Sequence, residues 1–390
     1  MGNDRGSAEH TATRSGVRRP EPVRPADRHL PPVPPSAPGR NRALGVSMLA
    51  VLALGLLFSA LNPALFTPGD ARLETVLTGD WMAGYQTEYE RGLPIRDWAV
   101  NAWGLLQYGL FREGRPGVLV GENDWLYTSE EFARHREGER LIEHHARLVA
   151  EVRERLARRG IELVVALVPA KARIYPERLG RYRLPEYTAE RYRRFRSALL
   201  AEGVPAPDLK QALLEAKNGR QVFLRTDTHW TPEGARVAAR ALAEAVEPVL
   251  EERAAPRRRF VAEAVGERTY AGDLTAFLPV VPFRGQVPAE PDRVRQYRIE
   301  DRDPPEIGLF DEVPHPVTLV GTSYSAGEVW DFEGALRVEL QAEVLNLAEE
   351  GRGPFAPMEA YLSGEAVAEV PPEVVVWEIP ERYVTTAGPF

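Results

Sequence analysis

A helical segment followed at once by an apolar strand constrains the fold of this chain more than any other feature. Residues 141–159 gather their apolar side chains on one side of an amphipathic helix, and Gly160 ends that pattern. Residues 161–168 then form the continuous apolar run IELVVALV, which is typical of a central parallel strand covered on both faces. Helix and strand joined by one glycine predict an α/β protein, a three-layer α/β/α sandwich around a mainly parallel sheet.

Shorter patterns add further elements to this sandwich. Residues 317–320 and 374–379 are apolar runs that predict two more core strands, and residues 222–224 predict a third. Residues 118–127 place apolar runs on both sides of a Gly-Glu-Asn-Asp turn, which indicates a hairpin. Residues 260–316 are rich in Pro and Gly, and their broken periodicity predicts an insertion between core elements.

An aspartate and a histidine lie together in the motif TDTHWTPEG, directly after the predicted strand at residues 222–224. A long helical pattern follows, with Thr231 as its expected N-cap and Pro232 at its first position. Asp227 and His229 are two positions apart, and such side chains point the same way on an extended chain. A carboxylate that binds one ring nitrogen leaves the other nitrogen free as a base. The alternative is structural, with Asp227 capping the helix and His229 hydrogen-bonded in the core.

A serine stands at the tip of a second strand-to-turn motif, TLVGTSYS. Both motifs follow predicted parallel strands, whose carboxyl ends meet at one edge of a sheet. The sequence therefore predicts a triad of Ser323, His229 and Asp227, with the backbone N–H groups of Ser323 and Tyr324 as oxyanion donors. Ser325 is the rival nucleophile, but its position suits a cap of the following helix better.

Two cations, Lys171 and Arg173, lie in the loop that follows the apolar run at residues 161–168. Ligands of open α/β sheets bind outside the carboxyl ends of the strands, so these cations are candidate binding residues. A solvated basic loop is an equally consistent interpretation of the same residues.

The N-terminal part of the chain predicts a membrane anchor. Residues 1–42 are rich in Pro and Arg and nearly free of large apolar side chains, which indicates a disordered tail. Residues 43–62 hold the uncharged run ALGVSMLAVLALGLLFSAL, close to the ~20 residues that a helix needs to span a bilayer. Because Arg40 and Arg42 precede this run, we expect a signal-anchor helix and an outward domain at residues 67–390. A cleaved signal peptide and a buried core helix are the alternatives.

Composition excludes several classes of site and partner. The chain has no cysteine, which rules out disulfides, thiolate metal sites and a cysteine nucleophile. None of its seven histidines forms the H-E-x-x-H spacing of a zinc protease. A net charge of −8, without a long basic run in the body, argues against nucleic acid as a partner. We expect neither a metal nor a cofactor.

Taken in this order, the two motifs resemble those of the alginate O-acetyltransferase family of the AlgJ and AlgX type, which has an SGNH-hydrolase-like domain. The likeness covers about residues 67–390, and it is closer to AlgJ because an anchor precedes the domain and no carbohydrate-binding module follows it. The serine block departs from the usual Gly-Asp-Ser, since Thr322 holds the middle place. Further matching stretches are LPIRD at 93–97, GRPGVLVG at 114–121, DWLY at 124–127, VPAK at 168–171, IYP at 174–176 and GDL at 272–274.

The resemblance implies a two-step acetyl transfer through the serine to hydroxyl groups of an exopolysaccharide, alginate or a similar polymer, in the bacterial periplasm. It implies a single-pass inner-membrane protein that receives acetyl groups from a membrane-bound O-acyltransferase. Trp125, Trp230 and Tyr324 are then expected to stack on sugar rings, with core packing as the alternative. Lys171 and Arg173 are expected to bind the carboxylates of a uronate polymer. Two rival functions stay open, an acetylesterase that uses water and a non-catalytic polysaccharide-binding scaffold of a secretion complex.

Overall fold

The chain groups into two compact units, residues 1–93 and residues 94–390. Residues 1–37 of the predicted disordered tail lie outside the described residues. The computed structural model describes residues 38–61, 72–92, 94–281, 287–304, 313–364, 367 and 371–386.

The described residues of the first unit form the helices α1 (Pro38–Leu61), α2 (Leu73–Thr78) and α3 (Asp80–Gly92). Helix α1 contains the uncharged run and begins upstream of it, so residues 38–42 are helical, whereas the sequence placed them in a disordered tail. Within the parts of the chain that the structure describes, no helix is both long enough and apolar enough to cross a membrane.

The second unit is built on a parallel sheet of four strands in the order β3-β8-β6-β7. Strand β3 pairs with β8 from Glu162↔Val374 to Val168↔Pro380, and β8 pairs in parallel with β6. This confirms the predicted central parallel sheet and three of its predicted strands. The bounds are β3 (Glu162–Val168), β6 (Val317–Val320), β7 (Val344–Asn346) and β8 (Val374–Pro380).

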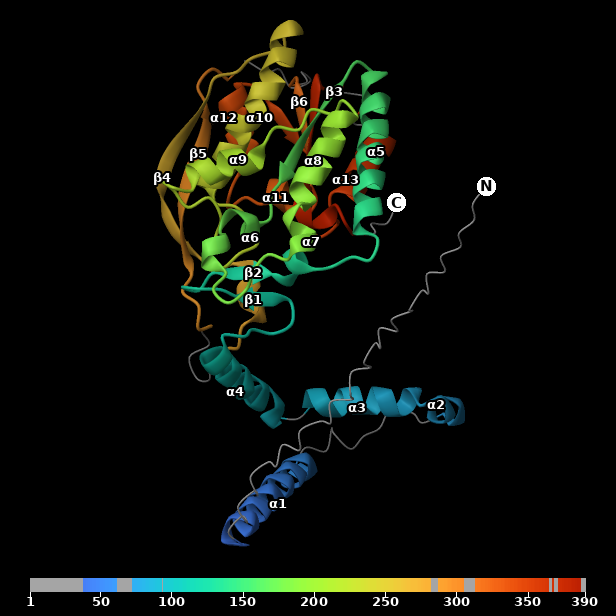
Figure 1. The fold of residues 1–390 in the computed structure, drawn as a ribbon, viewed down its shortest axis with the longest axis vertical. Coiled ribbons are helices and arrows are strands. Elements are labelled where there is room, and N and C mark those ends of the chain that lie inside the picture. The colour runs from blue at the N-terminus through green and yellow to red at the C-terminus, as the bar shows by residue number, and fades with distance from the viewer. Residues whose placement is uncertain are drawn as a thin grey trace, which may run out of the picture. The chain divides into compact units, whose positions relative to one another are not determined.

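Two groups of helices cover the two faces of this sheet. Alternate side chains of β3 enter different cores, Val164 and Ala166 on one face and Leu163 and Val165 on the other. The first core is closed by α9 (Leu209–Ala216), α10 (Pro232–Glu252) and α12 (Phe332–Leu340). The second is closed by α5 (Gly138–Ala157), α8 (Arg191–Ala201) and α13 (Phe355–Ser363). Figure 1 shows α10 and α12 on one side of β3 and β6 and α5 on the other.

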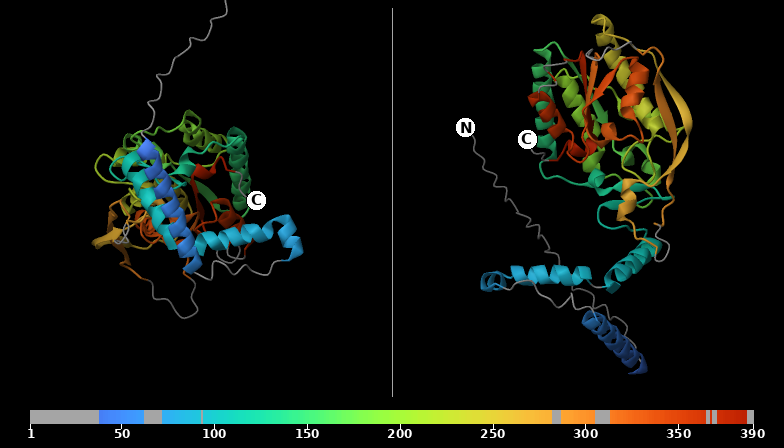
Figure 2. Two further views of the ribbon diagram at one scale, coloured as in Figure 1. Left: turned by 90° about the horizontal axis from the view of Figure 1, so that it is seen from below. Right: turned by 180° about the vertical axis from the view of Figure 1, so that it is seen from behind.

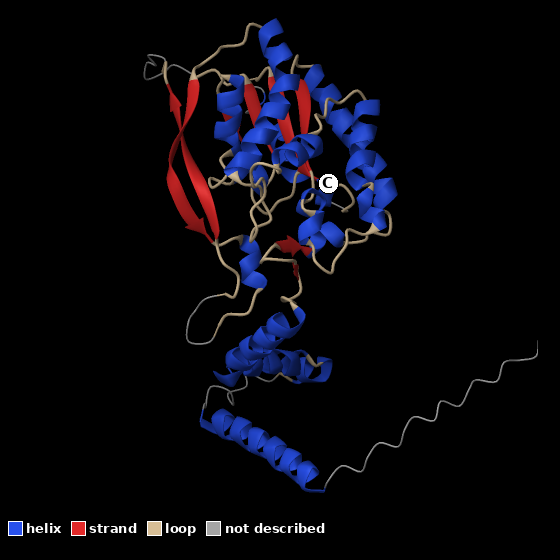
Figure 3. Ribbon diagram, turned by 60° about the vertical axis from the view of Figure 1, so that its left-hand side comes forward, coloured by secondary structure: helices blue, strands red, loops and turns tan. Residues whose placement is uncertain are grey.

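Two pairs of antiparallel strands lie outside the central sheet. The predicted hairpin is confirmed as β1 (Val118–Val120) and β2 (Leu126–Thr128). The predicted insertion contains a long ribbon, β4 (Phe260–Tyr270) paired with β5 (Asp292–Asp301), and Figure 3 shows it beside the central sheet. Most side chains of β4 are exposed, and its register shifts between Ala264 and Gly266, so no regular alternation marked it in the sequence.

The predicted strand at residues 222–224 is wrong. This run makes one isolated antiparallel bridge, Phe223 with Trp230, and it joins none of the sheets found in the described part of the chain. Its backbone bonds with the chain that returns after the loop, since Leu224 N–H donates to the His229 carbonyl at 3.1 Å and Thr231 N–H to the Val222 carbonyl at 3.0 Å. Side chains bind other backbone groups of this run, since the Val222 N–H donates to the Tyr175 hydroxyl and Nε2 of Gln221 donates to the Phe223 carbonyl, each at 2.9 Å, so these groups are not available to a sheet.

Because all four core strands run in parallel, their carboxyl ends meet at one edge, which Figure 2 shows from a second side. Several short helices begin there or near the hairpin, among them α6 (Lys171–Ile174) after β3 and α11 (Ser323–Ala326) after β6. The other α-helices described in this unit are α4 (Pro94–Phe111) and α7 (Glu186–Ala189). Short 3₁₀ helices lie at Ser129–Phe132, Pro176–Arg178, Asp273–Phe277 and Glu381–Tyr383.

Candidate active site

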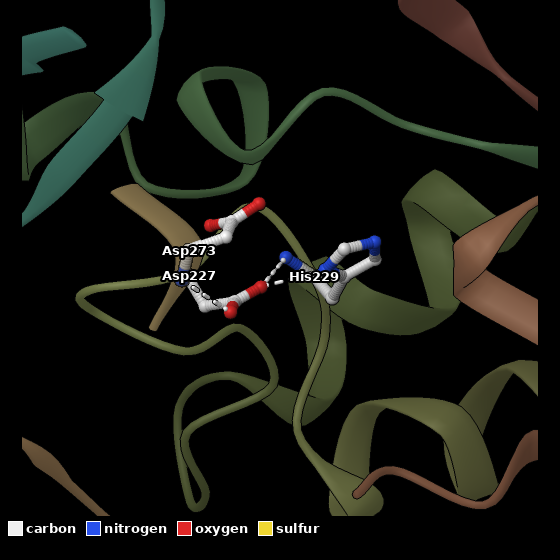
Figure 4. A group of neighbouring side chains, drawn as sticks. All are labelled: Asp227, His229 and Asp273. Atoms are coloured by element: carbon white, nitrogen blue, oxygen red, sulfur yellow. Dashed lines mark hydrogen bonds and ion pairs between the residues drawn. The ribbon is translucent and has the colours of Figure 1, made fainter. Parts of the chain in front are cut away.

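Three polar side chains form an unbroken chain of hydrogen bonds at this edge of the sheet. Ser323 opens α11 three residues after the end of β6, and its Oγ lies 2.7 Å from Nε2 of His229. Nδ1 of His229 lies 2.6 Å from Oδ1 of Asp227. Figure 4 shows the Asp227 carboxylate directed at the His229 ring. The structure thus brings together the three residues that the two sequence motifs contribute.

The loop that holds Asp227 and His229 is bent rather than extended, contrary to the geometry assumed from the sequence. Oδ1 of Asp227 accepts the backbone N–H of His229 at 2.9 Å as well as the ring nitrogen. An aspartate that binds a backbone N–H two residues on forms an Asx-type turn, which folds the loop back on itself. One carboxylate oxygen therefore fixes both the backbone and the ring of His229.

The acceptor chemistry of Asp227 decides which ring nitrogen of His229 carries a proton. An ionised carboxylate only accepts hydrogen bonds, so Nδ1 of His229 is the donor in the 2.6 Å contact. In neutral His229 the other nitrogen, Nε2, is then an acceptor, and the hydroxyl of Ser323 donates to it. This is the arrangement in which a histidine can remove a proton from a serine.

The surroundings of Asp227 keep its carboxyl ionised. Burial raises the pKa of this carboxyl, but the hydrogen bond and charge of His229, together with backbone N–H donors, outweigh burial and hold the pKa well below its ordinary value. Its second oxygen, Oδ2, accepts the hydroxyl of Tyr270 at 3.0 Å and the backbone N–H of Asp273 at 2.9 Å. Both donors come from the end of the β4 strand and the turn that follows it.

Aromatic rings hold the plane of the His229 imidazole. The ring of Trp330 stacks on it at a centroid distance of 4.2 Å and an interplanar angle of 16°, and Tyr324 meets it edge-on at 4.6 Å. The indole N–H of Trp330 donates to the carbonyl of Ser323 at 3.1 Å. Trp330 therefore links the histidine and the serine halves of the site.

A buried acid, Glu378 of β8, holds the turn that carries Ser323. Its Oε2 accepts the backbone N–H of Thr322 at 2.7 Å and the Thr322 hydroxyl at 2.9 Å. Burial raises the pKa of the Glu378 carboxyl to about 7. Gly321 allows this close approach, because a Cβ at that position would lie 2.6 Å from Oε2 of Glu378.

The rival serine, Ser325, faces away from the histidine. It is buried, and its hydroxyl lies 3.2 Å from Oε2 of Glu378. It is not the helix cap that the sequence suggested, since the Thr322 hydroxyl accepts the backbone N–H of Tyr324 and caps α11 one turn earlier. The geometry therefore favours Ser323 as the nucleophile.

The two predicted oxyanion donors differ in the structure. The backbone N–H of Tyr324 is bound to the Thr322 hydroxyl at 3.3 Å, so it is partly committed. The backbone N–H of Ser323 has no acceptor among the residues that the structure describes. Ser323 N–H is thus the more available of the two for a developing oxyanion.

Asp227, His229 and Asp273 also have the composition of a metal site, with one potential ligand atom from each within 4.8 Å of the others. Hydrogen bonds already use these atoms. Both oxygens of Asp227 and both ring nitrogens of His229 are bound as described above, and Oδ1 of Asp273 accepts the Thr228 N–H at 2.8 Å. The donor set therefore fits a hydrogen-bonded triad better than a metal centre.

Comparison with known proteins places this geometry in a family. Residues 118–381 match the family model described as "SGNH hydrolase-like domain, acetyltransferase AlgX". The chain belongs to this SGNH-hydrolase-like acetyltransferase family. It is 42% identical to the probable alginate O-acetylase AlgJ of Azotobacter vinelandii over 86% of this chain and 87% of that protein. It is 41% identical to the protein of that name from Pseudomonas aeruginosa, over 80% of this chain and 82% of that protein.

A solved structure agrees with this assignment. The O-acetyltransferase domain of Pseudomonas putida AlgJ superposes with a TM-score of 0.63 at 42% sequence identity, covering 71% of this chain and 95% of that domain. The predicted resemblance to the SGNH-hydrolase-like acetyltransferase family is therefore confirmed, and so is the predicted SGNH-like α/β fold.

The two cations expected to bind substrate face the protein interior in this family member. Lys171 is fully buried, and its ammonium donates to three backbone carbonyls. The guanidinium of Arg173 is bound by Glu381, with 2.9 Å from Nε to Oε2, and by the carbonyls of Thr188 and Ala189. Both side chains are thus bound within the protein, and neither is directed at a ligand. The prediction that they contact polymer carboxylates is therefore wrong.

The three aromatic residues expected to stack on sugars pack in the core instead. Trp230 and Tyr324 are 0% and 1% exposed and contact each other edge-on, and Trp125 is 5% exposed against the Tyr175 ring. The alternative of core packing is therefore the correct one for all three. Tyr324 keeps a place in the site through its ring contact with His229.

Sequence reasoning missed four residues that hold the triad, namely Tyr270, Asp273, Trp330 and Glu378. Glu378 carried a signal, because it is the only acid inside the apolar run VVVWEIP of β8. A lone acid in a strand buried on both faces requires hydrogen-bond donors beside it. Asp273 lies in the GDL stretch that resembled the family, whereas Tyr270 and Trp330 carried no comparable local signal.

Proposed function

We propose that this protein is an O-acetyltransferase that places acetyl groups on hydroxyls of an exopolysaccharide, alginate or a similar polymer, through an acetyl-serine intermediate. The observation that carries the proposal is the hydrogen-bonded chain from Ser323 through His229 to Asp227, in a family of acetyltransferases. A serine hydroxyl becomes nucleophilic when a positioned base takes its proton. The two contacts, 2.7 Å and 2.6 Å long, supply that base and its orienting carboxylate.

In the first half-reaction, Oγ of Ser323 attacks the carbonyl carbon of an acetyl donor while its proton passes to Nε2 of His229. The bond between the acetyl carbon and the donor oxygen breaks, and the His229 proton moves to that leaving oxygen. Asp227 remains ionised and stabilises the transient imidazolium. The backbone N–H of Ser323 stabilises the oxyanion of the tetrahedral intermediate.

In the second half-reaction, a sugar hydroxyl gives its proton to Nε2 of His229 and attacks the acetyl carbon on Ser323. The ester bond to Oγ breaks, and Oγ recovers the proton from His229. The acetyl group then resides on the sugar, and the enzyme returns to its starting state. If water replaces the sugar, the same steps yield acetate, which is the esterase reaction.

Catalysis belongs to the periplasm of a bacterial cell in this proposal. The uncharged run at residues 43–61 serves as an uncleaved single-pass anchor in the inner membrane, because Arg40 and Arg42 retain its N-terminal side in the cytoplasm. The domain at residues 67–390 then acts outside. A membrane-bound O-acyltransferase supplies the acetyl groups across the membrane, and the exopolysaccharide accepts them.

Acetyl transfer to sugar tests this proposal. The full chain, purified in detergent, is incubated with a chromogenic acetyl ester and oligosaccharides of uronic acids, and acetylated sugar is measured by mass spectrometry. We expect product from the wild type and none from His229→Ala. Ester cleavage that never yields acetylated sugar would favour the esterase. Equal behaviour of wild type and His229→Ala in both assays would favour the scaffold.

A further inference from the structure

Lys171 is a buried cation whose three N–H donors all end on the loop that carries the triad acid and base. Its Nζ lies 3.0 Å from the carbonyl oxygen of Leu224, 3.3 Å from that of Arg225 and 2.6 Å from that of Asp227. An ammonium group has three hydrogens, so these three carbonyls match its capacity to donate. We propose that Lys171 is a positioning residue, which holds this loop so that Asp227 and His229 are aligned for proton transfer to and from Ser323.

The place of Lys171 in the fold suits this role. It follows β3 in the segment that opens α6, and its side chain is fully buried. Its Nζ lies 5.1 Å from the ring centroid of Tyr127 and 5.9 Å from that of Trp125, whose negative faces stabilise a cation. Glu131 fixes the lysine backbone, since its Oε1 accepts the Lys171 N–H at 3.0 Å. A side chain so enclosed does not reach a polymer, but it does reach the loop.

Carboxylates accept N–H groups of this loop, and Lys171 donates to its carbonyl groups. Oδ1 and Oδ2 of Asp292 accept the N–H groups of Arg225 and Thr226, each at 2.9 Å. Lys171 binds the carbonyls, and among the described residues no other side chain donates to those of Leu224, Arg225 or Asp227. Loss of the ammonium would leave the buried carbonyl oxygens of Leu224 and Asp227 without a donor among the described residues, whereas that of Arg225 would keep the Leu126 N–H at 2.8 Å, and the loop would shift to find other donors.

Such a shift reaches the chemistry directly, because the carbonyl at 2.6 Å from Lys171 belongs to the residue whose carboxylate orients His229. Misplacement of a catalytic group by about 1 Å can cost roughly 100-fold in rate. The inference rests on the proposed function, since it assigns Lys171 to the same proton-transfer step.

The chain offers a matched control for this lysine. Nζ of Lys217 also donates to a backbone carbonyl, that of Ile174 at 2.6 Å, and lies 5.3 Å from the ring centroid of Tyr175. Among the described residues its ammonium makes no hydrogen bond or ion pair with the loop of residues 224–229, and it pairs with Glu177 instead. Lys217→Met therefore removes a similar lysine without touching the triad.

The test compares wild type, Lys171→Met and Lys217→Met as full chains in detergent, with folding checked by circular dichroism. The probe is phenylmethylsulfonyl fluoride, which modifies an activated serine without an acetyl donor or a sugar. We expect sulfonylation of Ser323 to slow about 10–100-fold in Lys171→Met, with unchanged reagent affinity, and to stay within about twofold of wild type in Lys217→Met. The downfield proton resonance of the His229 Nδ1–H should shift or vanish only in Lys171→Met.

The outcomes separate the inference from the proposed function. A wild type that never reacts with the sulfonyl fluoride would contradict the proposed function, and the Nδ1–H resonance would still test the role of Lys171. A reactive wild type with Lys171→Met unchanged in rate and resonance would overturn the inference. If Lys171→Met does not fold, Lys171→Gln is used in its place, because it keeps amide donors on a shorter side chain. Failure of both to fold would assign Lys171 to folding alone and overturn the inference as well.

Discussion

At the scale of single residues, the site depends on the Asp227 carboxylate, whose two oxygens only accept hydrogen bonds. Asp227 uses both oxygens as acceptors, two bonds to His229 on one and the Tyr270 hydroxyl and Asp273 N–H on the other. This leaves His229 one orientation and one tautomer in which to meet Ser323. The charge of Asp227 matters most when His229 is protonated, because the carboxylate then stabilises the imidazolium.

Replacing that carboxylate by an amide should therefore remove most of the activity. Asp227→Asn keeps the size of the side chain but lets an amide donor face the His229 ring, which favours the wrong tautomer. We expect kcat for a chromogenic acetyl ester to fall about 10³–10⁴-fold, with a lower Tm as well, because the amide NH2 faces hydrogen-bond donors that the buried carboxylate accepted. Asp208→Asn is the control, since Oδ1 of Asp208 accepts the Gln211 N–H at the start of α9 and the Tyr192 hydroxyl, and an amide oxygen can do the same. Activity of Asp227→Asn above a tenth of wild type would contradict this role.

Glu378 should make stability depend on pH in a defined direction. Its pKa is raised to about 7 by burial, so between about pH 4.5 and 7 the folded protein keeps a proton that the unfolded chain releases. The free energy of unfolding should thus fall as pH rises through this window, by about 3 kcal/mol from this group. Glu378→Gln, which stays neutral, should flatten the slope in urea unfolding curves. The control Glu267→Gln, on the exposed face of β4, should keep the wild-type slope. An unchanged slope in Glu378→Gln would show that Glu378 does not cause this pH dependence.

At the scale of elements, helix α10 anchors the histidine loop to one face of the sheet. Thr231 is its N-cap and accepts the Gly234 N–H at 3.1 Å, while its hydroxyl donates to the Gln221 carbonyl at 2.6 Å. The cap thus begins the helix and ties the two ends of the loop together. The helix then buries its apolar face against β3 and β8.

The elements that the sequence predicted well are those with a strong local pattern. Helix α10 begins at Pro232 after its Thr231 cap, as predicted, and β3, β6 and β8 follow apolar runs buried on both faces. The serine, histidine and aspartate of the site were also identified from their motifs. Two predictions failed for different reasons. Residues 222–224 form a short apolar run like that of a core strand, but they pair with their own return segment seven residues on. Lys171 is buried because three carbonyls from 53 to 56 positions away surround it, which a local window of sequence does not reveal.

Removing the cap tests the coupling between this helix and the loop. Thr231→Ala loses both hydroxyl bonds, and we expect the free energy of unfolding to fall by about 1–2 kcal/mol in urea titrations. Thr231→Ser retains the hydroxyl and should recover most of that loss. A Ser variant as unstable as the Ala variant would show that methyl packing, and not the cap, accounts for the effect.

At the scale of the whole molecule, the parallel sheet assembles a site from segments that are far apart in sequence. His229 and Ser323 are 94 positions apart in the sequence. Glu378, which accepts the Thr322 N–H, is 56 positions from Thr322. No contiguous part of the chain holds the nucleophile, its base and its supports together. The site therefore exists only when β3, β6 and β8 are in register and their carboxyl ends meet. The segments that meet at this edge are residues 168–171, 224–230, 270–273, 320–330 and 378.

The central claim is that this assembled edge transfers acetyl groups through Ser323, and trapping the covalent intermediate tests it most directly. The full chain is mixed with p-nitrophenyl acetate, quenched in acid, digested and mapped by mass spectrometry. We predict an acetyl ester on Ser323 in the wild type and in Ser325→Ala, and none in Ser323→Ala. An acetyl group on Ser325, or undiminished ester turnover by Ser323→Ala, would contradict the account.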